Sequence, residues 1–140
     1  MLRAGLPANL SDARGNSLLM LACYHGELAT ARMLLEHGAE VDRRNNRHQT
    51  PLGGAAFKGY GPIVALLLEH GADIDADNGV GMTPLMFASV FGRTQVVAQL
   101  QAHGASLARR NRLGLSARSL ARLASFFRLL FGRKARPAPR

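Results

Sequence analysis

The sequence is poor in the features that mark secreted and membrane-spanning proteins. It contains a single cysteine, so no internal disulfide can form. It has no run of eighteen apolar residues, which predicts no membrane-spanning helix. Its first ten residues lack the apolar segment of a secretory signal. Together these absences favour a reducing compartment, and we expect a cytoplasmic location.

Acidic residues are missing from the whole C-terminal part of the chain. All nine lie at or before Asp77, whereas eleven of the eighteen basic residues follow it, and the formal net charge is +9. Sixteen of the basic residues are arginine, so an arginine-rich genome explains the excess as well as a basic binding surface does. In either case a partner of this protein meets a strongly positive C-terminal half.

What the sequence does contain is an internal repeat of thirty-three residues. The columns that persist under this shift include hydroxyl residues, small residues and glycines: Ser17, Thr50, Thr83 and Ser116; Ala22, Ala55, Ala88 and Ala121; Gly26, Gly59 and Gly92; Gly38, Gly71 and Gly104. Each unit is typical of a capped inner helix, a glycine stop, an outer helix, a second glycine and an extended finger.

The period, the two TPL segments at 50–52 and 83–85 and the helix-pair layout resemble the ankyrin repeat. The resemblance implies an all-α solenoid of stacked helix–turn–helix units joined by β-turn finger loops. We expect one domain over 1–132, which divides into a partial unit 1–14, full repeats 15–47, 48–80 and 81–113, and a degenerate capping unit 114–132. The basic stretch 133–140 is expected to be disordered. This compact layout is similar to that of small bacterial ankyrin proteins.

Local signals predict the helices within each unit. Ser17 is expected to cap an inner helix over 18–24, and the outer helix is expected over about 27–37. Ankyrin repeats usually carry a histidine after TPL that bonds to the threonine, and this chain has Met20, Gly53 and Met86 there instead, so that bond should be absent. In the closing unit we expect an inner helix over 117–123 and a second piece over 125–131 that lays Phe127 and Leu130 over the third repeat.

The first residues resemble the end of a repeat rather than its beginning, since Leu2 and Gly5 are in register with Leu35 and Gly38. We therefore expect a missing upstream unit and an uncovered apolar face on the N-terminal side. The residues expected to lack cover are Leu19, Leu28 and Leu34. Such a face would be open to self-association, to a partner or to an upstream segment.

Residues that could carry chemistry do not form a catalytic or ligand-binding constellation. His37, His70 and His103 share one repeat position, so stacking separates them by roughly 10 Å, too far for one metal ion. Cys23 shares its column with Ala56 and Ser89, which predicts a packed thiol. We expect no catalysis, no cofactor, no bound metal and no small-molecule substrate.

The resemblance implies that the finger tips and the exposed side of the inner helices form a concave recognition face for a protein partner. The residues carried over by position are Arg14, Asn16, Tyr24, His25, Arg44, Asn46, Arg47, Gln49, Phe57, Lys58, Asp77, Val80, Met82, Val90, Phe91, Arg110, Arg112, Leu113 and Leu115. Aromatic and arginine side chains dominate protein interfaces, and this stripe suits an apolar surface with an acidic rim. The alternative is that Phe57 and Phe91 only close the core between repeats.

Two other partners come from the basic C-terminal half. Arg118, Arg122 and Arg128 fall near one helical face, and leucines and phenylalanines lie on the other, so the segment could rest on an anionic membrane. We favour a capping role, because this apolar face is expected to cover the third repeat. Arg109, Arg110 and Arg112 could contact nucleic acid, but only its backbone and with a steep salt dependence.

Overall fold

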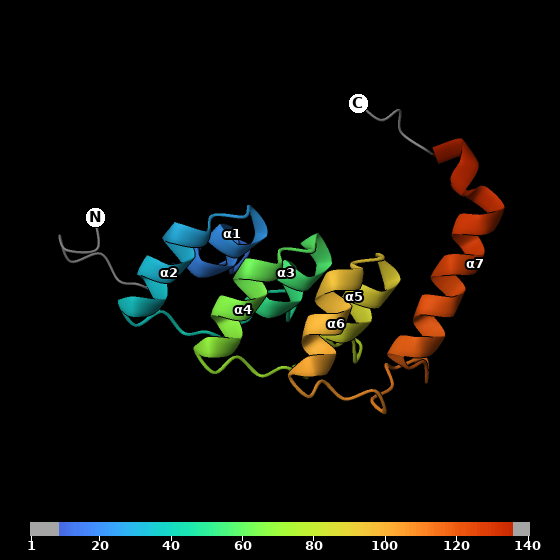
Figure 1. The fold of residues 1–140 in the computed structure, drawn as a ribbon. Coiled ribbons are helices and arrows are strands. Elements are labelled where there is room, and N and C mark those ends of the chain that lie inside the picture. The colour runs from blue at the N-terminus through green and yellow to red at the C-terminus, as the bar shows by residue number, and fades with distance from the viewer. Residues whose placement is uncertain (1–8, 136–140) are drawn as a thin grey trace.

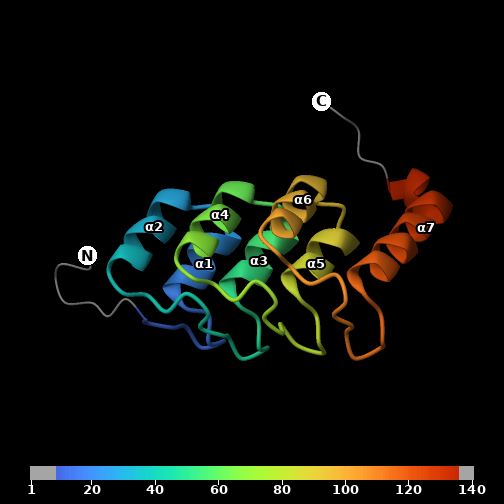
Figure 2. The same cartoon turned by 60° about the horizontal axis from the view of Figure 1, so that its bottom comes forward.

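The computed structural model describes residues 9–135, and within them the chain forms seven helices and no strand. The helices are α1 (Leu18–Tyr24), α2 (Leu28–Glu36), α3 (Pro51–Lys58), α4 (Gly61–Glu69), α5 (Pro84–Val90), α6 (Thr94–Ala102) and α7 (Ala117–Ala135). The pairs α1–α2, α3–α4 and α5–α6 stack side by side in chain order, and α7 follows α5 at the end of the row (Figure 1). Long loops extend from one side of the stack and form the row of fingers (Figure 2). The predicted all-α solenoid is confirmed.

The inner helices α1, α3 and α5 begin at side-chain caps, as their sequences predict. The hydroxyl groups of Ser17, Thr50 and Thr83 accept hydrogen bonds from the backbone N–H groups three residues further on, at 3.0, 3.1 and 3.3 Å. These bonds satisfy N–H groups that have no partner inside the helix. Pro51 and Pro84 occupy the first helical position, where a missing N–H costs nothing.

The apolar columns of the repeat form one core that runs through all the units. The inner-helix leucines Leu19, Leu52 and Leu85 and the outer-helix leucines Leu34, Leu67 and Leu100 are all buried in the same cluster. No unit has a core of its own, because each helix pair covers the apolar side of the next pair.

Side chains on the finger segments also connect each unit to the next. Asn9, Asp42 and Asp75 are spaced by thirty-three residues, and each accepts a hydrogen bond from a backbone N–H of the following unit. The donors are Glu40 at 2.8 Å, Asp73 at 3.0 Å and Ser106 at 3.0 Å. Burial raises the pKa of Asp42, although the Asp73 N–H bond opposes that shift.

The expected apolar face on the N-terminal side is wrong for the residues that predicted it. Leu19 and Leu34 are only 1% and 3% exposed, and Leu28 is half-buried. The cause is that α1 and α2 pack against each other and against α3 and α4, which covers these leucines from within the array. The expectation for Leu2 and Gly5 lies outside the described residues.

The closing unit also differs from the expectation, because α7 is one continuous helix of 19 residues instead of two pieces. Glycine ends the inner helices of the earlier units in a left-handed conformation, with φ of +76° at Gly26 and +69° at Gly92. The same register position in the last unit is Ser125, which has no such preference, so the helix continues. It includes residues 133–135, which belong to the stretch that the sequence predicts to be disordered; residues 136–140 lie outside the described part.

As a result the second half of α7 does not cover the third repeat. Phe127 and Leu130, expected to pack there, are 55% and 53% exposed. The first half packs on α5 through buried Ala117 and half-buried Leu120. Arg128 donates from Nη1 to the backbone oxygen of Val90 at 3.2 Å. Val90 is the last residue of α5, and a positive charge at the C-terminus of a helix is stabilising.

Candidate functional site

The concave side of the array contains a groove of about 720 Å³ between the finger tips and the inner helices. Its lining comes from three successive repeats, so no single unit could form it. The lining residues are Ala13, Arg14, Asn16, Met20, Leu21, Tyr24, Asn45, Asn46, Arg47, Gln49, Gly53, Gly54, Phe57, Asn78, Phe87 and Phe91. One wall is aromatic and apolar, and the other is made of amide and arginine side chains.

The aromatic wall is a continuous ladder of rings across α1, α3 and α5. Tyr24 and Phe57 stack with their centroids 6.1 Å apart and an interplanar angle of 6°. Phe57 then meets Phe91 edge-on at 4.6 Å and Phe87 edge-on at 6.5 Å. Such pairs contribute about 0.5–1.5 kcal/mol each beyond the burial of their area, so the ladder is a rigid surface. Tyr24 and Phe91 remain 39% and 45% exposed, while Phe57 is half-buried between them. Phe57 thus packs against rings of both neighbouring repeats and also lines the groove.

A lysine covers the outer end of this ladder. The Lys58 ammonium lies 4.8 Å from the centre of the Tyr24 ring, a cation–π contact, and the His25 ring meets Tyr24 edge-on at 5.7 Å. Lys58 and His25 therefore border the aromatic wall without lining the groove itself.

The polar wall is held in place by Asn45. Its Oδ1 accepts from the backbone N–H groups of Arg47 and Gln49 at 2.9 and 3.0 Å, which fixes the finger turn. Its Nδ2 donates to the side-chain oxygens of Asn16 and Gln49 at 2.9 and 2.8 Å. The amide groups of the wall are therefore oriented before any partner binds, and Arg47 projects from the exposed tip of the same finger.

The third finger has a different turn. Here Asp77, one place earlier in the register, accepts from the N–H groups of Gly79 and Gly81 at 2.8 and 3.0 Å. Val80 and Gly81 both have positive φ, +49° and +77°, and the N–H of Met82 donates to the oxygen of Gly79 at 3.0 Å. This pattern is a tight turn with two left-handed residues. It carries Val80 away from the groove lining and leaves it 55% exposed.

Arg44 and Asp77 connect the fingers. The Arg44 guanidinium donates from Nε and Nη2 to the backbone oxygen of Asp77, at 3.2 and 3.0 Å. Both residues were predicted to face a partner, but their interactions join the second finger to the third.

Of the residues predicted from the sequence, eight line the groove: Arg14, Asn16, Tyr24, Asn46, Arg47, Gln49, Phe57 and Phe91. The other predicted residues do not line the groove: His25, Arg44, Lys58, Asp77, Val80, Met82, Val90, Arg110, Arg112, Leu113 and Leu115. Arg110, Arg112, Leu113 and Leu115 belong to the fourth finger, beyond the end of the groove, and Arg110 donates to the backbone oxygen of Gly114 at 2.8 Å.

The sequence reasoning missed Phe87 and the floor of the groove. Leu21, Gly54 and Phe87 occupy one column of the repeat, and all three line the groove. Each lies two residues after a leucine of the buried inner-helix column. The absent side chain of Gly54 deepens the groove between the other two. Residues of such different size in one column indicate a position outside the tightly packed core, and all three are half-buried.

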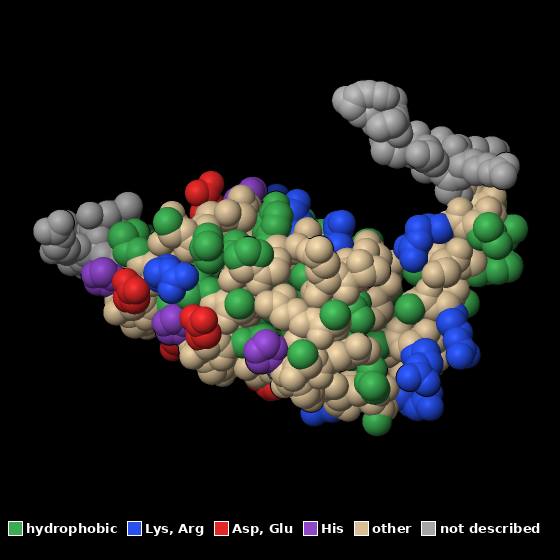
Figure 3. Space-filling view, viewed as in Figure 1, with side chains coloured by type: hydrophobic (Ala, Val, Ile, Leu, Met, Phe, Trp, Pro, Cys, Tyr) green, Lys and Arg blue, Asp and Glu red, His purple; other side chains and the backbone are tan. Residues whose placement is uncertain are grey.

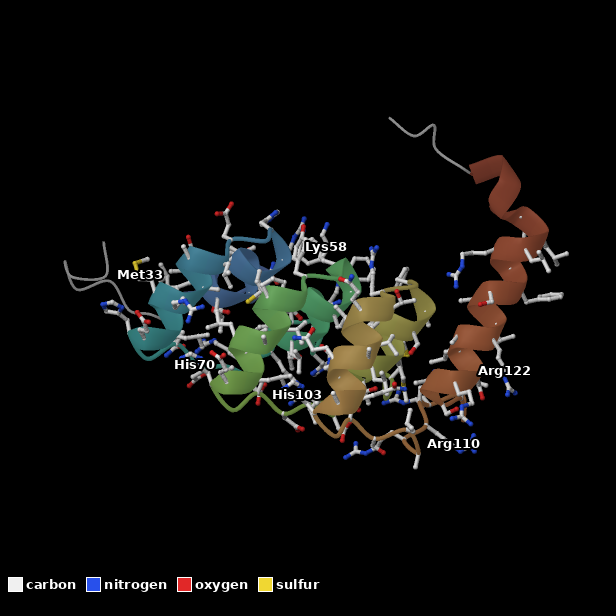
Figure 4. The ribbon with its side chains drawn as sticks, viewed as in Figure 1. Met33, Lys58, His70, His103, Arg110 and Arg122 are labelled. Atoms are coloured by element: carbon white, nitrogen blue, oxygen red, sulfur yellow. The ribbon has the colours of Figure 1, made fainter. Side chains whose placement is uncertain are left out.

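The three repeated histidines and Cys23, the other candidates for chemistry, have structural roles. The Nδ1 atoms of His37, His70 and His103 each donate to the carbonyl four residues earlier, at 2.8, 3.0 and 2.9 Å. His70 and His103 lie at the ends of separate helices, as Figure 4 shows. Cys23 is fully buried, and burial raises the pKa of its thiol to about 12.

Residues 9–135 offer neither a metal site nor a membrane-spanning helix. No three histidine, cysteine, aspartate or glutamate side chains come together there as metal ligands. None of the helices in that range combines the length and apolar character needed to cross a bilayer.

Stacked helix pairs with a finger loop after each pair, and a groove along the inner helices, define a repeat protein of the solenoid class. The sequence profile described as ankyrin repeats (3 copies) matches residues 1–78 and 47–111, and the chain belongs to the ankyrin-repeat family. Ankyrin repeats are generally protein–protein interaction modules and are typically non-catalytic.

Three relatives are similar to this chain over short stretches. The chain is 38% identical over 64 residues, 46% of its length, to the ankyrin repeat and KH domain-containing protein mask-1 of Caenorhabditis elegans. It is 42% identical over 50 residues, 36% of its length, to the protein fem-1 homolog A-like of Mus musculus, and 54% identical over 33 residues, 24% of its length, to an ankyrin repeat protein of Pseudomonas aeruginosa. These matches span 2%, 8% and 19% of the relatives' own lengths.

Proposed function

We propose that this protein is a non-catalytic adaptor that holds a protein partner in the groove of its concave face. The observation that supports it is the aromatic ladder of Tyr24, Phe57, Phe87 and Phe91, which leaves ring surface open to solvent beside an oriented polar wall. Rigid aromatic side chains next to arginines are the composition that dominates binding energy at protein interfaces.

The two walls define the chemistry of the partner. The aromatic wall suits apolar or aromatic side chains, which it would desolvate. The opposite wall presents Arg14 and Arg47 with amides from Asn16, Asn46 and Gln49, which suits carboxylates and backbone carbonyls. The proposed partner therefore offers an apolar segment bordered by acidic residues. A cytoplasmic location is part of this proposal.

Photo-crosslinking in the native cell tests the face. Benzoylphenylalanine placed at position 47 lies at the groove, and the same group at position 33 lies on the exposed side of α2. We expect position 47 to crosslink a discrete protein, and we expect position 33 not to crosslink that protein. A partner captured from position 33 and not from position 47 would place binding on the outer face and overturn the proposal.

Titration with the captured partner then tests the ladder. Tyr24→Ala and Phe91→Ala each remove an exposed ring, and we expect each to weaken binding by about tenfold or more, as for other aromatic anchors. Met33→Ala removes a side chain of similar exposure (40%) from α2 and should leave the affinity unchanged. Thermal unfolding of all three variants shows whether the array is intact. Equal affinity in all of them would remove the ladder from the interface.

A further inference from the structure

The second half of α7 carries a dense group of exposed apolar side chains. They are Leu123, Phe126, Phe127, Leu129, Leu130 and Phe131, with exposed fractions from 44% to 77%. Scattered apolar residues are normal on a protein surface, but six within nine residues form a continuous patch. In Figure 3 the apolar side chains of α7 cluster on its side away from the stacked repeats.

The charges around this patch are all positive. Arg118 and Arg122 are exposed and line a shallow hollow on α7 together with Phe126 and Leu129. No acidic residue occurs anywhere after Asp77. Arginine side chains therefore lie beside phenylalanine and leucine side chains on one surface, and no carboxylate on α7 neutralises them.

We propose that the second half of α7 docks on an anionic lipid bilayer. The phenylalanine and leucine side chains would enter the boundary between head groups and acyl chains. The arginines would lie along the helix and reach the lipid phosphates, since their long side chains can bury the stem and keep the charged end in water. Each basic residue near such a surface adds to the attraction.

The arrangement of the patch favours lipid over another helix. Phe126 and Phe127 are consecutive, as are Leu129 and Leu130, and consecutive residues point about 100° apart on a helix. The apolar surface is thus much wider than the narrow seam that pairs two helices. A second copy of α7 would also bring Arg118 and Arg122 against the same positive charges, with no acidic residue on the helix to pair with them.

The first half of α7 keeps its place in the array during such docking. Ala117 and Leu120 in the first half, together with the Arg128 bond to Val90, hold α7 on α5, and the groove is lined by residues of the first three repeats and by none of α7. The bilayer and the protein partner would therefore occupy different surfaces. This inference is independent of the proposed function, and variants in α7 and in the groove separate the two.

Tryptophan fluorescence provides the direct test, because the chain contains no tryptophan. Phe126→Trp reports on α7 and Met33→Trp reports on α2, which lies at the opposite end of the array (Figure 4). With vesicles of phosphatidylserine and phosphatidylcholine we expect a blue shift for Phe126→Trp and none for Met33→Trp. With phosphatidylcholine alone we expect no shift. An equal shift on both lipids, or no shift on either, overturns the proposal.

Vesicle sedimentation of the full chain separates the apolar and basic contributions. Phe127→Ser combined with Leu130→Ser should lower partitioning by about tenfold or more. Arg122→Gln should lower it by about fivefold, and added salt should remove the difference. The matched controls are Met33→Ser and Arg32→Gln on α2, which should partition as the wild type does, and thermal unfolding confirms that each variant is folded. A blue shift of Phe126→Trp that grows with protein concentration in the absence of vesicles would instead assign the patch to a second copy of the chain.

Discussion

Asn78, at the base of the third finger, reaches back to Thr50, the cap of α3 at the other end of the same repeat. Its Oδ1 accepts from the backbone N–H of Thr50 at 2.7 Å and from the Thr50 hydroxyl at 3.0 Å, and all of these groups are buried. The asparagine at the same register position in the neighbouring units, Asn45 or Asn111, instead fixes its own finger. Asn78 is free to do otherwise because Asp77 has taken over the finger turn. The bond takes the place of the one that a histidine after TPL would make to Thr50, and it joins the two ends of the second repeat.

The first prediction concerns this bond. Asn78→Ala leaves the buried Thr50 N–H and hydroxyl without their acceptor, and we expect a loss of about 2–3 kcal/mol in the free energy of unfolding, measured in urea. Asn111→Ala, the control, removes an acceptor for the exposed N–H of Leu113 and the half-buried N–H of Leu115 and should cost about 1 kcal/mol. Equal losses in the two variants would contradict a special role for Asn78.

The two glycines of α3 should respond oppositely to alanine. A methyl group at Gly53 would collide with the Asn78 amide, so Gly53→Ala should destabilise the protein by about 2 kcal/mol through loss of the Thr50 bonds. A methyl group at Gly54 meets only ordinary contacts, 3.7 Å from Met20 Sδ and Tyr24 Cδ1, so Gly54→Ala should stabilise α3 by about 0.5–1 kcal/mol. Urea midpoints of both variants decide this, and a stable Gly53→Ala protein would refute the packing described.

His48 occupies a left-handed position with φ of +66°, where the other units have Gly15, Gly81 and Gly114. That conformation is unfavourable for a residue with a Cβ atom. Replacing His48 with glycine would relieve this strain, but the greater conformational entropy of glycine in the unfolded chain would offset part of the stabilisation. We expect His48→Gly to raise the free energy of unfolding by about 0.5–1 kcal/mol. His48→Val, which places a branched side chain there, should lower it, and the same order must appear in melting temperatures.

The acid dependence of stability should change when Asp42 becomes asparagine. Because burial raises the pKa of Asp42, the folded protein holds this proton more tightly than the unfolded chain does. The stabilisation is complete at acid pH and is lost as the pH rises through the raised pKa. Asp42→Asn keeps an oxygen for the Asp73 N–H, as Asn9 does in the preceding unit, and cannot ionise.

We therefore expect Asp42→Asn to be more stable than the wild type at neutral pH, and the advantage to shrink toward about pH 4. Urea unfolding across this range measures it. Asp77→Asn is the control, since the Asp77 side chain is exposed. An advantage for Asp42→Asn that grows toward acid pH would reverse the sign and exclude this explanation.

The Cys23 thiol should be inert in the folded protein. It is fully buried with a pKa of about 12, so almost no thiolate exists at pH 8 and no reagent reaches it. A colorimetric thiol reagent should react negligibly with the native chain and completely in denaturant. Cys23→Ala, matching Ala56 in the next unit, should behave like the wild type in partner binding, and rapid native labelling would show that α1 opens.

Features that recur in every unit could be predicted from the sequence, because a column of three or four residues reports the same environment several times. The caps Ser17, Thr50 and Thr83 and the leucine columns of the core are of this kind. Part of the aromatic wall of the groove could be predicted in the same way, because Tyr24 and Phe57 share a column.

Departures from the repeat could not be predicted in the same way. A single substitution, Ser125 where the earlier units have glycine, turns two expected helical pieces into one. A shift of one residue at Asp77 changes the turn of the third finger and redirects Asn78. Each depends on which of two local hydrogen-bonding arrangements has the lower free energy, and one copy of a pattern does not reveal that.

The uneven placement of charge along the array gives the molecule a large electric dipole moment. Every carboxylate side chain belongs to the units before the third finger tip, and the excess of guanidinium groups belongs to those after it. In the field near any negatively charged layer this dipole produces a torque that turns the α7 end inward and the first repeat outward. The protein would then arrive already oriented, with the N-terminal end of its groove facing the surrounding solution.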